Sequence, residues 1–166
     1  ADSEWIADRV LELINAERNK LGYPALSTAP KAHEIATIRA QQLTTFFSHE
    51  DELGNNAAAI LYHKYKYNPN ATSEFAVYDK EGNYEWYRSY GPGGSENIGQ
   101  VGNGCCTDIN ADVANDLFYG FKSSSAHWSD ISNPEYTGVG IGVVVIQKGM
   151  GYDAYCCILT MDRTYG

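Results

Sequence analysis

The apolar residues of the N-terminal segment recur every three or four positions, which is the spacing of one face of a helix. Charged residues lie between the members of this set, which are Ile6, Val10, Leu13, Ile14 and Leu21. Ser3 is expected to cap the first turn, and Gly22 stands where a left-handed residue commonly ends a helix. The pattern therefore predicts an amphipathic helix between Ser3 and Gly22.

Two more helices are expected before residue 70. The second runs from Pro30 to about Thr45, and its buried face is formed by Ala32, Ile35, Ala36, the stem of Arg39, Ala40 and Leu43. An alanine-rich run favours a third helix between Asn56 and Tyr67, with Asn56 as its cap.

The C-terminal third predicts a fourth helix followed by a hairpin. Asp108 is expected to cap the helix, Ser123–Ser125 to end it, and its buried positions are Val113, Leu117 and Phe121. The runs Val139–Ile146 and Tyr152–Met161 are β-branched and aromatic, and a glycine-containing turn joins them. Both alternating sets of positions are apolar in these strands, so both faces of the sheet should be covered.

The middle of the chain combines aromatic strands with glycine-rich breaks. Phe75–Tyr87 predicts a hairpin around the turn Asp79–Asn83, in which Gly82 provides a positive φ. Gly91–Gly94 and Gly102–Gly104 predict that loops dominate the rest of this region. Helices on either side of a small antiparallel sheet are the architecture that these elements imply.

Composition narrows the class of protein. The chain has 166 residues, which suits one domain, and a net charge of −9, which excludes nucleic-acid binding. No run of about 20 apolar residues is present, so no transmembrane segment is expected.

The four cysteines form two adjacent pairs, Cys105-Cys106 and Cys156-Cys157. Neighbouring Cα atoms lie about 3.8 Å apart, which is below the usual span of a disulfide, so a bridge within a pair would be strained. At least one bridge between the pairs is therefore expected. A second is harder to form, because Cys156 and Cys157 should point to opposite faces of one strand. Paired cysteines indicate an oxidising, extracellular setting.

Histidines and one glutamate are the candidates for chemistry. His33 and His63 are interpreted as surface side chains without a function. His49 and His127 each follow a predicted helix beside hydroxyls and acids, and Glu96 lies between the two glycine-rich breaks. From spacing alone, each of these three is as well explained by hydrogen bonds that tie down a loop.

Five segments in order carry a resemblance to a known family: Asn15–Arg18, Phe47–His49, Glu96–Gly99, Ser124–His127 and Tyr136–Gly142. They resemble the CAP superfamily of cysteine-rich secretory, antigen 5 and pathogenesis-related 1 proteins, in its bacterial SCP-like form. The match runs from about Val10 to about Met161. The resemblance implies one α+β domain over residues 1–166, a secreted three-layer α/β/α sandwich with a central antiparallel sheet.

The resemblance also implies a ligand cleft lined by His49, Glu96 and His127. Ser124 stands where eukaryotic members have a second glutamate, so the family's full set of four residues is absent. His49 and His127 are expected to converge with Glu96 and to bind a divalent metal, zinc by preference, weakly. No other cofactor is expected.

The resemblance covers the insert at about residues 56–94 least. Its aromatic residues offer faces for sugar rings or for a partner's apolar surface, or else they cover the edge of the sandwich: Tyr62, Tyr65, Tyr67, Tyr78, Tyr84, Trp86, Tyr87 and Tyr90.

Two functions are weighed. The preferred one is an extracellular binding module whose partner is a small ligand, a glycan, a lipid or a protein. The alternative is a metal-dependent hydrolase that uses His49, His127 and Glu96 as base. A nucleophilic Ser124 or Ser125 is the least favoured, because neither lies in a strand-turn-helix elbow. The family resemblance brings no established catalytic activity, which favours the binding module over an enzyme.

Overall fold

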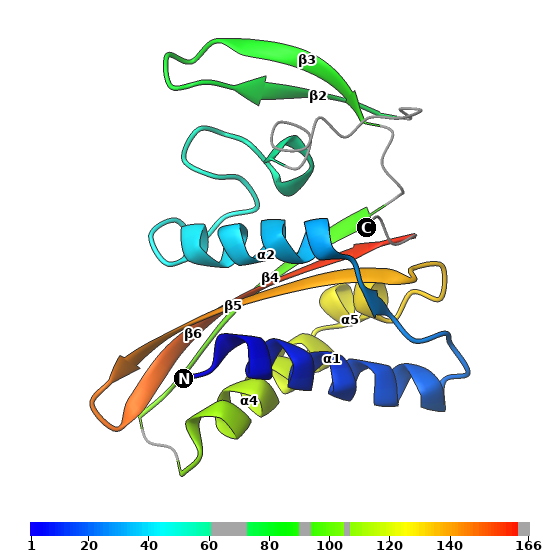
Figure 1. The fold of residues 1–166 in the computed structure, drawn as a ribbon, viewed down its shortest axis with the longest axis vertical. Helices are drawn as coiled ribbons and strands as arrows, with labels where there is room; N and C mark the ends of the chain where they lie inside the picture. The colour runs from blue at the N-terminus through cyan, green and yellow to red at the C-terminus, as the bar shows by residue number, and fades with distance from the viewer. Residues whose placement is uncertain (61–72, 90–93, 105–106, 163–166) are drawn as a thin grey trace.

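The computed structural model describes residues 1–60, 73–89, 94–104 and 107–162. Its main sheet has the order β1-β5-β6-β4 and is built from β1 (Ser27–Thr28), β4 (Gly94–Asn103), β5 (Gly138–Lys148) and β6 (Gly151–Met161). One face of the sheet is covered by helix α2 (Pro30–Leu43) (Figure 1). The other face is covered by α1 (Ser3–Lys20), α4 (Ile109–Ser123) and α5 (Ser125–Ile131). The α+β, three-layer prediction is confirmed.

The sheet is antiparallel except at one edge. Strand β6 pairs antiparallel with both β4 and β5, while the short β1 runs parallel to β5. Gly140 and Gly142 on β5 lie directly beneath α2, where an added Cβ would come within 2.3 Å and 2.0 Å of the helix backbone. Only glycine allows the helix to lie this close to the strand, which gives the Tyr136–Gly142 segment a structural role.

The predicted helices begin and end close to where the sequence indicates. Asp2, and not Ser3, caps α1, because its carboxylate accepts the N–H of Trp5 at 3.0 Å. Gly22 takes the left-handed conformation with φ of 76°. Asp108 caps α4 as predicted. The buried positions predicted for α2 are confirmed, and Arg39 is buried along its whole length.

Two loop predictions are wrong. Residues 94–103 form the ten-residue strand β4, which places Glu96 in the sheet. Gly99 in this strand allows close packing, because a Cβ added there would lie 2.8 Å from the ring of Phe121. Residues 125–131 form helix α5, capped by Ser124, so His127 lies on a helix.

The aromatic hairpin is confirmed as a separate two-stranded sheet of β2 (Ser73–Tyr78) and β3 (Tyr84–Ser89). Gly82 in its turn has φ of 82°. The hairpin lies beyond α2, on the side away from the main sheet (Figure 1). Residues 57–60 form a helical turn, and Asn56 caps it by accepting the N–H of Ala59 at 2.9 Å. The rest of the predicted third helix, which includes His63, lies outside the described residues. So do four of the insert's tyrosines, Tyr62, Tyr65, Tyr67 and Tyr90.

The structure does not contain the predicted bridge between the cysteine pairs. Cys156 and Cys157 are free, buried thiols on β6, and Cys105 and Cys106 lie outside the described residues. Successive strand residues point to opposite faces, so Cys156 packs beneath α1 and α4 while Cys157 packs beneath α2. Both are enclosed by the core. No helix of the described residues is long and apolar enough to cross a membrane.

Candidate functional site

The candidate site is organised by two consecutive residues of β4, Glu96 and Asn97. Strand alternation sends their side chains to opposite faces. Ile98, on the same face as Glu96, packs in the core beneath α2. Gly99, on the same face as Asn97, faces Phe121 of α4. Glu96 therefore belongs to the α2 side of the sheet, and Asn97 to the α4 and α5 side.

Glu96 is held by Arg39 of α2. The guanidinium donates from Nε to Oε2 at 2.8 Å and from Nη2 to Oε1 at 3.2 Å. Its Nη1 donates to Oε1 of Gln42 at 2.7 Å, and its Nη2 also donates to the carbonyl of Ser48. The arginine side chain is 0% exposed and that of Glu96 only 11%. A buried charge is tolerated when it is paired and hydrogen-bonded, as both are.

His49 lies on the outer side of this pair. Its Nδ1 is 2.9 Å from Oε1 of Glu96, and its side chain is 62% exposed. Because a carboxylate only accepts, Nδ1 carries the proton and donates it. In the neutral ring Nε2 is then the acceptor nitrogen. The network therefore gives a surface imidazole a defined orientation and tautomer.

His127 is held in a parallel way on the other face. Its Nδ1 is 2.7 Å from Oδ1 of Asn97, and its ring meets that of Phe121 edge to face at 5.4 Å. Asn97 is 3% exposed, and its Nδ2 has no hydrogen-bond partner within the part of the chain that the structure describes. Ser124, expected in the ligand cleft, accepts the backbone N–H of His127 at 3.5 Å and so caps the helix.

The segment after α5 is fixed by a second buried arginine, Arg18 of α1. Its guanidinium donates at 2.8 to 3.0 Å to the carbonyls of Pro24, Ile131, Asn133 and Tyr136. Asn15, one turn earlier, bonds to both backbone groups of Leu26. The Asn15–Arg18 segment is thus structural, and it holds the C-terminal end of the helix that carries His127.

Cys157 is the remaining reactive side chain near Glu96. Its Sγ lies 3.6 Å from Oε2 of that carboxylate. Burial, and next the charge of Glu96, raise the pKa of the Cys157 thiol well above its ordinary value. The protonated thiol is neither a nucleophile nor a metal ligand at neutral pH.

The structure brings together part of the predicted site. His49 and Glu96 meet, whereas no hydrogen bond or ion pair joins His127 to either of them within the described residues. Residues 1–60, 73–89, 94–104 and 107–162 contain no group of three or more His, Cys, Asp or Glu side chains placed to hold a metal ion. The residues present therefore do not fit a three-ligand zinc centre, and metal binding at His49 and His127 stays a prediction.

Two residues behave differently from expectation. His33, interpreted as a solvated surface residue, accepts the N–H of Ile141 at Nδ1, pairs with Glu4 through Nε2 at 2.9 Å, and is only 22% exposed. It ties α2 to α1 and β5. The role of Arg39 was missed. The available signal was an arginine on the buried face of a predicted helix, because a buried guanidinium needs acceptors for its N–H groups.

The protein is thus a three-layer α/β/α sandwich in which the edge strand β4 orients two histidines. Residues 11–159 match the family model of the cysteine-rich secretory protein family, CAP, and the chain belongs to this family. A search of characterised protein sequences gave no match.

Solved structures show the same fold. An extracellular protein with an SCP domain from Bacillus anthracis is 15% identical, with a TM-score of 0.59 over 97% of this chain. A cysteine-rich secretory protein from Staphylococcus aureus is 15% identical, with a TM-score of 0.60 over 98%. This chain spans 41% and 40% of those two proteins. An outer surface protein from Borrelia burgdorferi is 14% identical, with a TM-score of 0.60, and 98% of this chain and 97% of that one are covered.

Proposed function

We propose that this chain is an extracellular binding module that recognises its ligand through His49 and His127. The observation that carries the proposal is the exposed His49 ring, held by a carboxylate that a buried arginine holds in turn. A pre-oriented acceptor nitrogen at the surface reduces the entropy lost on binding. It suits a hydroxyl or amide donor on a small ligand, glycan, lipid or protein.

Binding is favoured over hydrolysis by the state of Glu96. Both of its oxygens accept hydrogen bonds from Arg39, and one also accepts from His49. Oε2 also accepts a hydrogen bond from the Cys157 thiol at 3.6 Å, so each oxygen accepts two hydrogen bonds. A general base needs a free lone pair within reach of the proton that it removes, and Glu96 has none left for that role. A hydrolase using His49, His127 and Glu96 therefore remains the weaker alternative.

The extracellular setting rests on the family and on its relatives. The Bacillus protein is described as extracellular and the Borrelia protein as an outer surface protein. An acidic chain with net charge −9 suits that setting. The buried free thiols of Cys156 and Cys157 contribute nothing to this argument.

The test compares four proteins on arrays of glycans, phospholipids and peptides: the wild type, His49→Ala, His127→Ala and the control Tyr119→Ala. Tyr119 is 64% exposed on α4 and takes no part in the histidine network. We expect one class of ligand to bind the wild type and the control but not the histidine variants. Equal binding by all four proteins would show that recognition lies elsewhere.

A further inference from the structure

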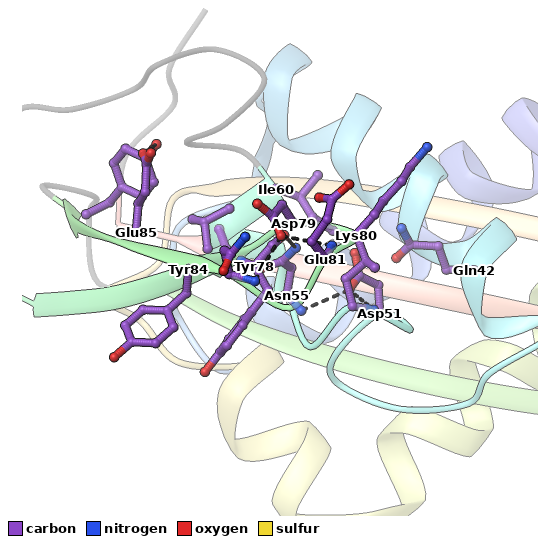
Figure 2. A pocket seen from close by; sticks show the side chains of 15 residues that line it. Gln42, Asp51, Asn55, Ile60, Tyr78, Asp79, Lys80, Glu81, Tyr84 and Glu85 are labelled. Carbon is purple, nitrogen blue, oxygen red and sulfur yellow. Dashed lines mark hydrogen bonds between the residues drawn. The ribbon is translucent and has the colours of Figure 1, made fainter.

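A pocket of about 700 Å³ lies apart from the two histidines, between the aromatic hairpin and the body of the domain. Its walls come from the end of α2, residues 51–60 and the strands and turn of the hairpin (Figure 2). This volume lies within the range of small-molecule sites in proteins. Nothing in the histidine network occupies it, although Gln42, which bonds to Arg39, also lines it.

The opening is held in place by one buried side chain, Asn55. Its amide accepts the N–H of Tyr78 at 2.8 Å and donates to the carbonyl of Tyr78 at 3.0 Å, in the manner of a neighbouring strand. Asn55 is 7% exposed. The ring of Tyr78 lies against Gly54, where an added Cβ would be 3.5 Å away. The hairpin is therefore fastened to the domain, and the pocket exists before any ligand arrives.

The charge of the walls is strongly one-sided. Four carboxylates line the pocket with a single lysine: Asp51, Asp79, Glu81, Glu85 and Lys80 (Figure 2). Among the described residues, no Lys or Arg forms an ion pair with any of these four carboxylates. Their negative potential is thus available to a ligand, and it favours a cationic ligand over an anionic one.

Three tyrosines add aromatic rings to the wall of the pocket. Tyr78, Tyr84 and Tyr87 line the pocket, and the hydroxyl of Tyr87 donates to Glu85 at 2.6 Å. The rings of Tyr78 and Tyr84 are inclined at 52°, and those of Tyr84 and Trp86 at 87°. Rings at these angles form no flat platform for a sugar. Successive strand residues point to opposite faces, so Tyr78 and Tyr84 lie on one face of the hairpin and Val77, Glu85 and Tyr87 on the other. The ring of Tyr87 beside the carboxylate of Glu85 is the environment that attracts an organic cation.

We infer that this pocket binds an ammonium or guanidinium group carried on an aliphatic stem. The carboxylates attract the charge, the ring of Tyr87 contacts the cation, and Ile60 and Val77 contact the stem. A free polyamine and a basic peptide both present this group. The pocket is a second binding site, separate from the histidine site, and its failure would leave the proposed function standing.

Calorimetric titration of the full chain with spermidine, and separately with tetralysine, tests the inference. The test variant is Glu81→Gln with Glu85→Gln, because Asp51 and Asp79 each accept two backbone N–H groups that shape their turns. The control, Asp8→Asn with Glu135→Gln, removes the same charge from exposed positions outside the pocket. Tyr87→Leu removes the ring beside Glu85 without changing the charge, and Tyr84→Ala removes a ring from the opposite face of the hairpin.

We expect saturable binding to the wild type, weakened about tenfold or more in the Glu81 and Glu85 variant and less than about threefold in the control. Tyr87→Leu should weaken binding about threefold or more, and Tyr84→Ala should weaken it less. Tighter binding of spermidine would assign a free amine, and tighter binding of tetralysine a basic peptide. Equal weakening in the test and control variants, or no saturable binding of either probe, would overturn the inference.

Discussion

Within the part of the chain that the structure describes, each face of the sheet has one fully buried arginine, and the two charges are compensated in different ways. Among the described residues, Arg18, on α1, donates only to neutral backbone carbonyls, whereas Arg39, on α2, donates to the carboxylate of Glu96. Each arginine positions one histidine indirectly. Arg18 fixes the end of α5, which carries His127, and Arg39 fixes the carboxylate that holds His49. Separate networks therefore support the two candidate histidines, His49 through Glu96 and His127 through Asn97, which are neighbouring residues of β4.

The difference predicts unequal consequences when each arginine is lost. Arg39→Met leaves Glu96 as a nearly buried charge without a cation, and we expect the free energy of unfolding to fall by about 3 to 5 kcal/mol. Urea unfolding at neutral pH measures this change. It is the largest effect expected of a single substitution in the site.

The control for this prediction is the double variant Arg39→Met with Glu96→Gln. Removing the charge as well as its partner should recover part of the lost stability, because a neutral amide is less costly to bury than a carboxylate. A double variant as unstable as Arg39→Met alone would contradict the assignment of the loss to an unpaired charge.

Arg18→Met should cost less, about 2 to 3 kcal/mol, because it leaves carbonyls without donors but no unpaired charge. Of its four carbonyl partners, the Ile131 bond is wholly buried and the other three are partly exposed, so water can replace those donors. Urea unfolding again measures the change.

The imidazole NMR signals then separate the two networks. Arg18→Met should shift those of His127 and leave those of His49 in place, and Arg39→Met should do the reverse. Both histidines responding to both substitutions would show that the networks are coupled.

The local sequence pattern predicted most of this fold, but it predicted few of the contacts that position the candidate site residues. Helices α1, α2 and α4 and both hairpins follow from periodicity and turn residues, as at Asp108 and Gly82. Strand β4 was missed because Gly94 and Gly102, near its two ends, belong to segments interpreted as breaks. Between them, Gly99 makes room for Phe121. Glu96 and Arg39 are 57 positions apart, so only the folded sheet shows that they pair. Family resemblance, and not spacing, selected His49, Glu96 and His127.

The histidines themselves should differ in stability on truncation. His127→Ala removes a partly buried ring that packs on Phe121 and leaves Asn97 without a donor, so a loss of about 1 to 2 kcal/mol is expected. His49→Ala removes a ring that is 62% exposed, and the change should stay within about 0.5 kcal/mol. Thermal and urea unfolding of both variants provide the check. Equal losses would mean that His49 is more deeply integrated than its exposure indicates.

The two thiols of β6 extend the comparison, since Cys156 belongs to the Arg18 face and Cys157 to the Arg39 face. Burial raises the pKa of both thiols, and near Cys157 the charge of Glu96 raises it further. In the unfolded chain a thiol loses its proton near pH 8.5, whereas in the folded chain it keeps it. The unfolded state then binds fewer protons, so the free energy of unfolding is level below about pH 8 and falls as the pH rises above it.

Each thiol should lower the free energy of unfolding by about 1 kcal/mol between pH 8 and about 9.5. Tyrosines and lysines also titrate in this range, so the measurement is the difference in alkaline slope between the wild type and Cys156→Ala or Cys157→Ala. Each alanine variant should lose one thiol's share of the slope, and native alkylation of either cysteine at pH 8 should be slow. An unchanged slope in both variants would show that these cysteines are not protonated free thiols in the folded protein, as they would not be if joined in the bridge predicted from sequence.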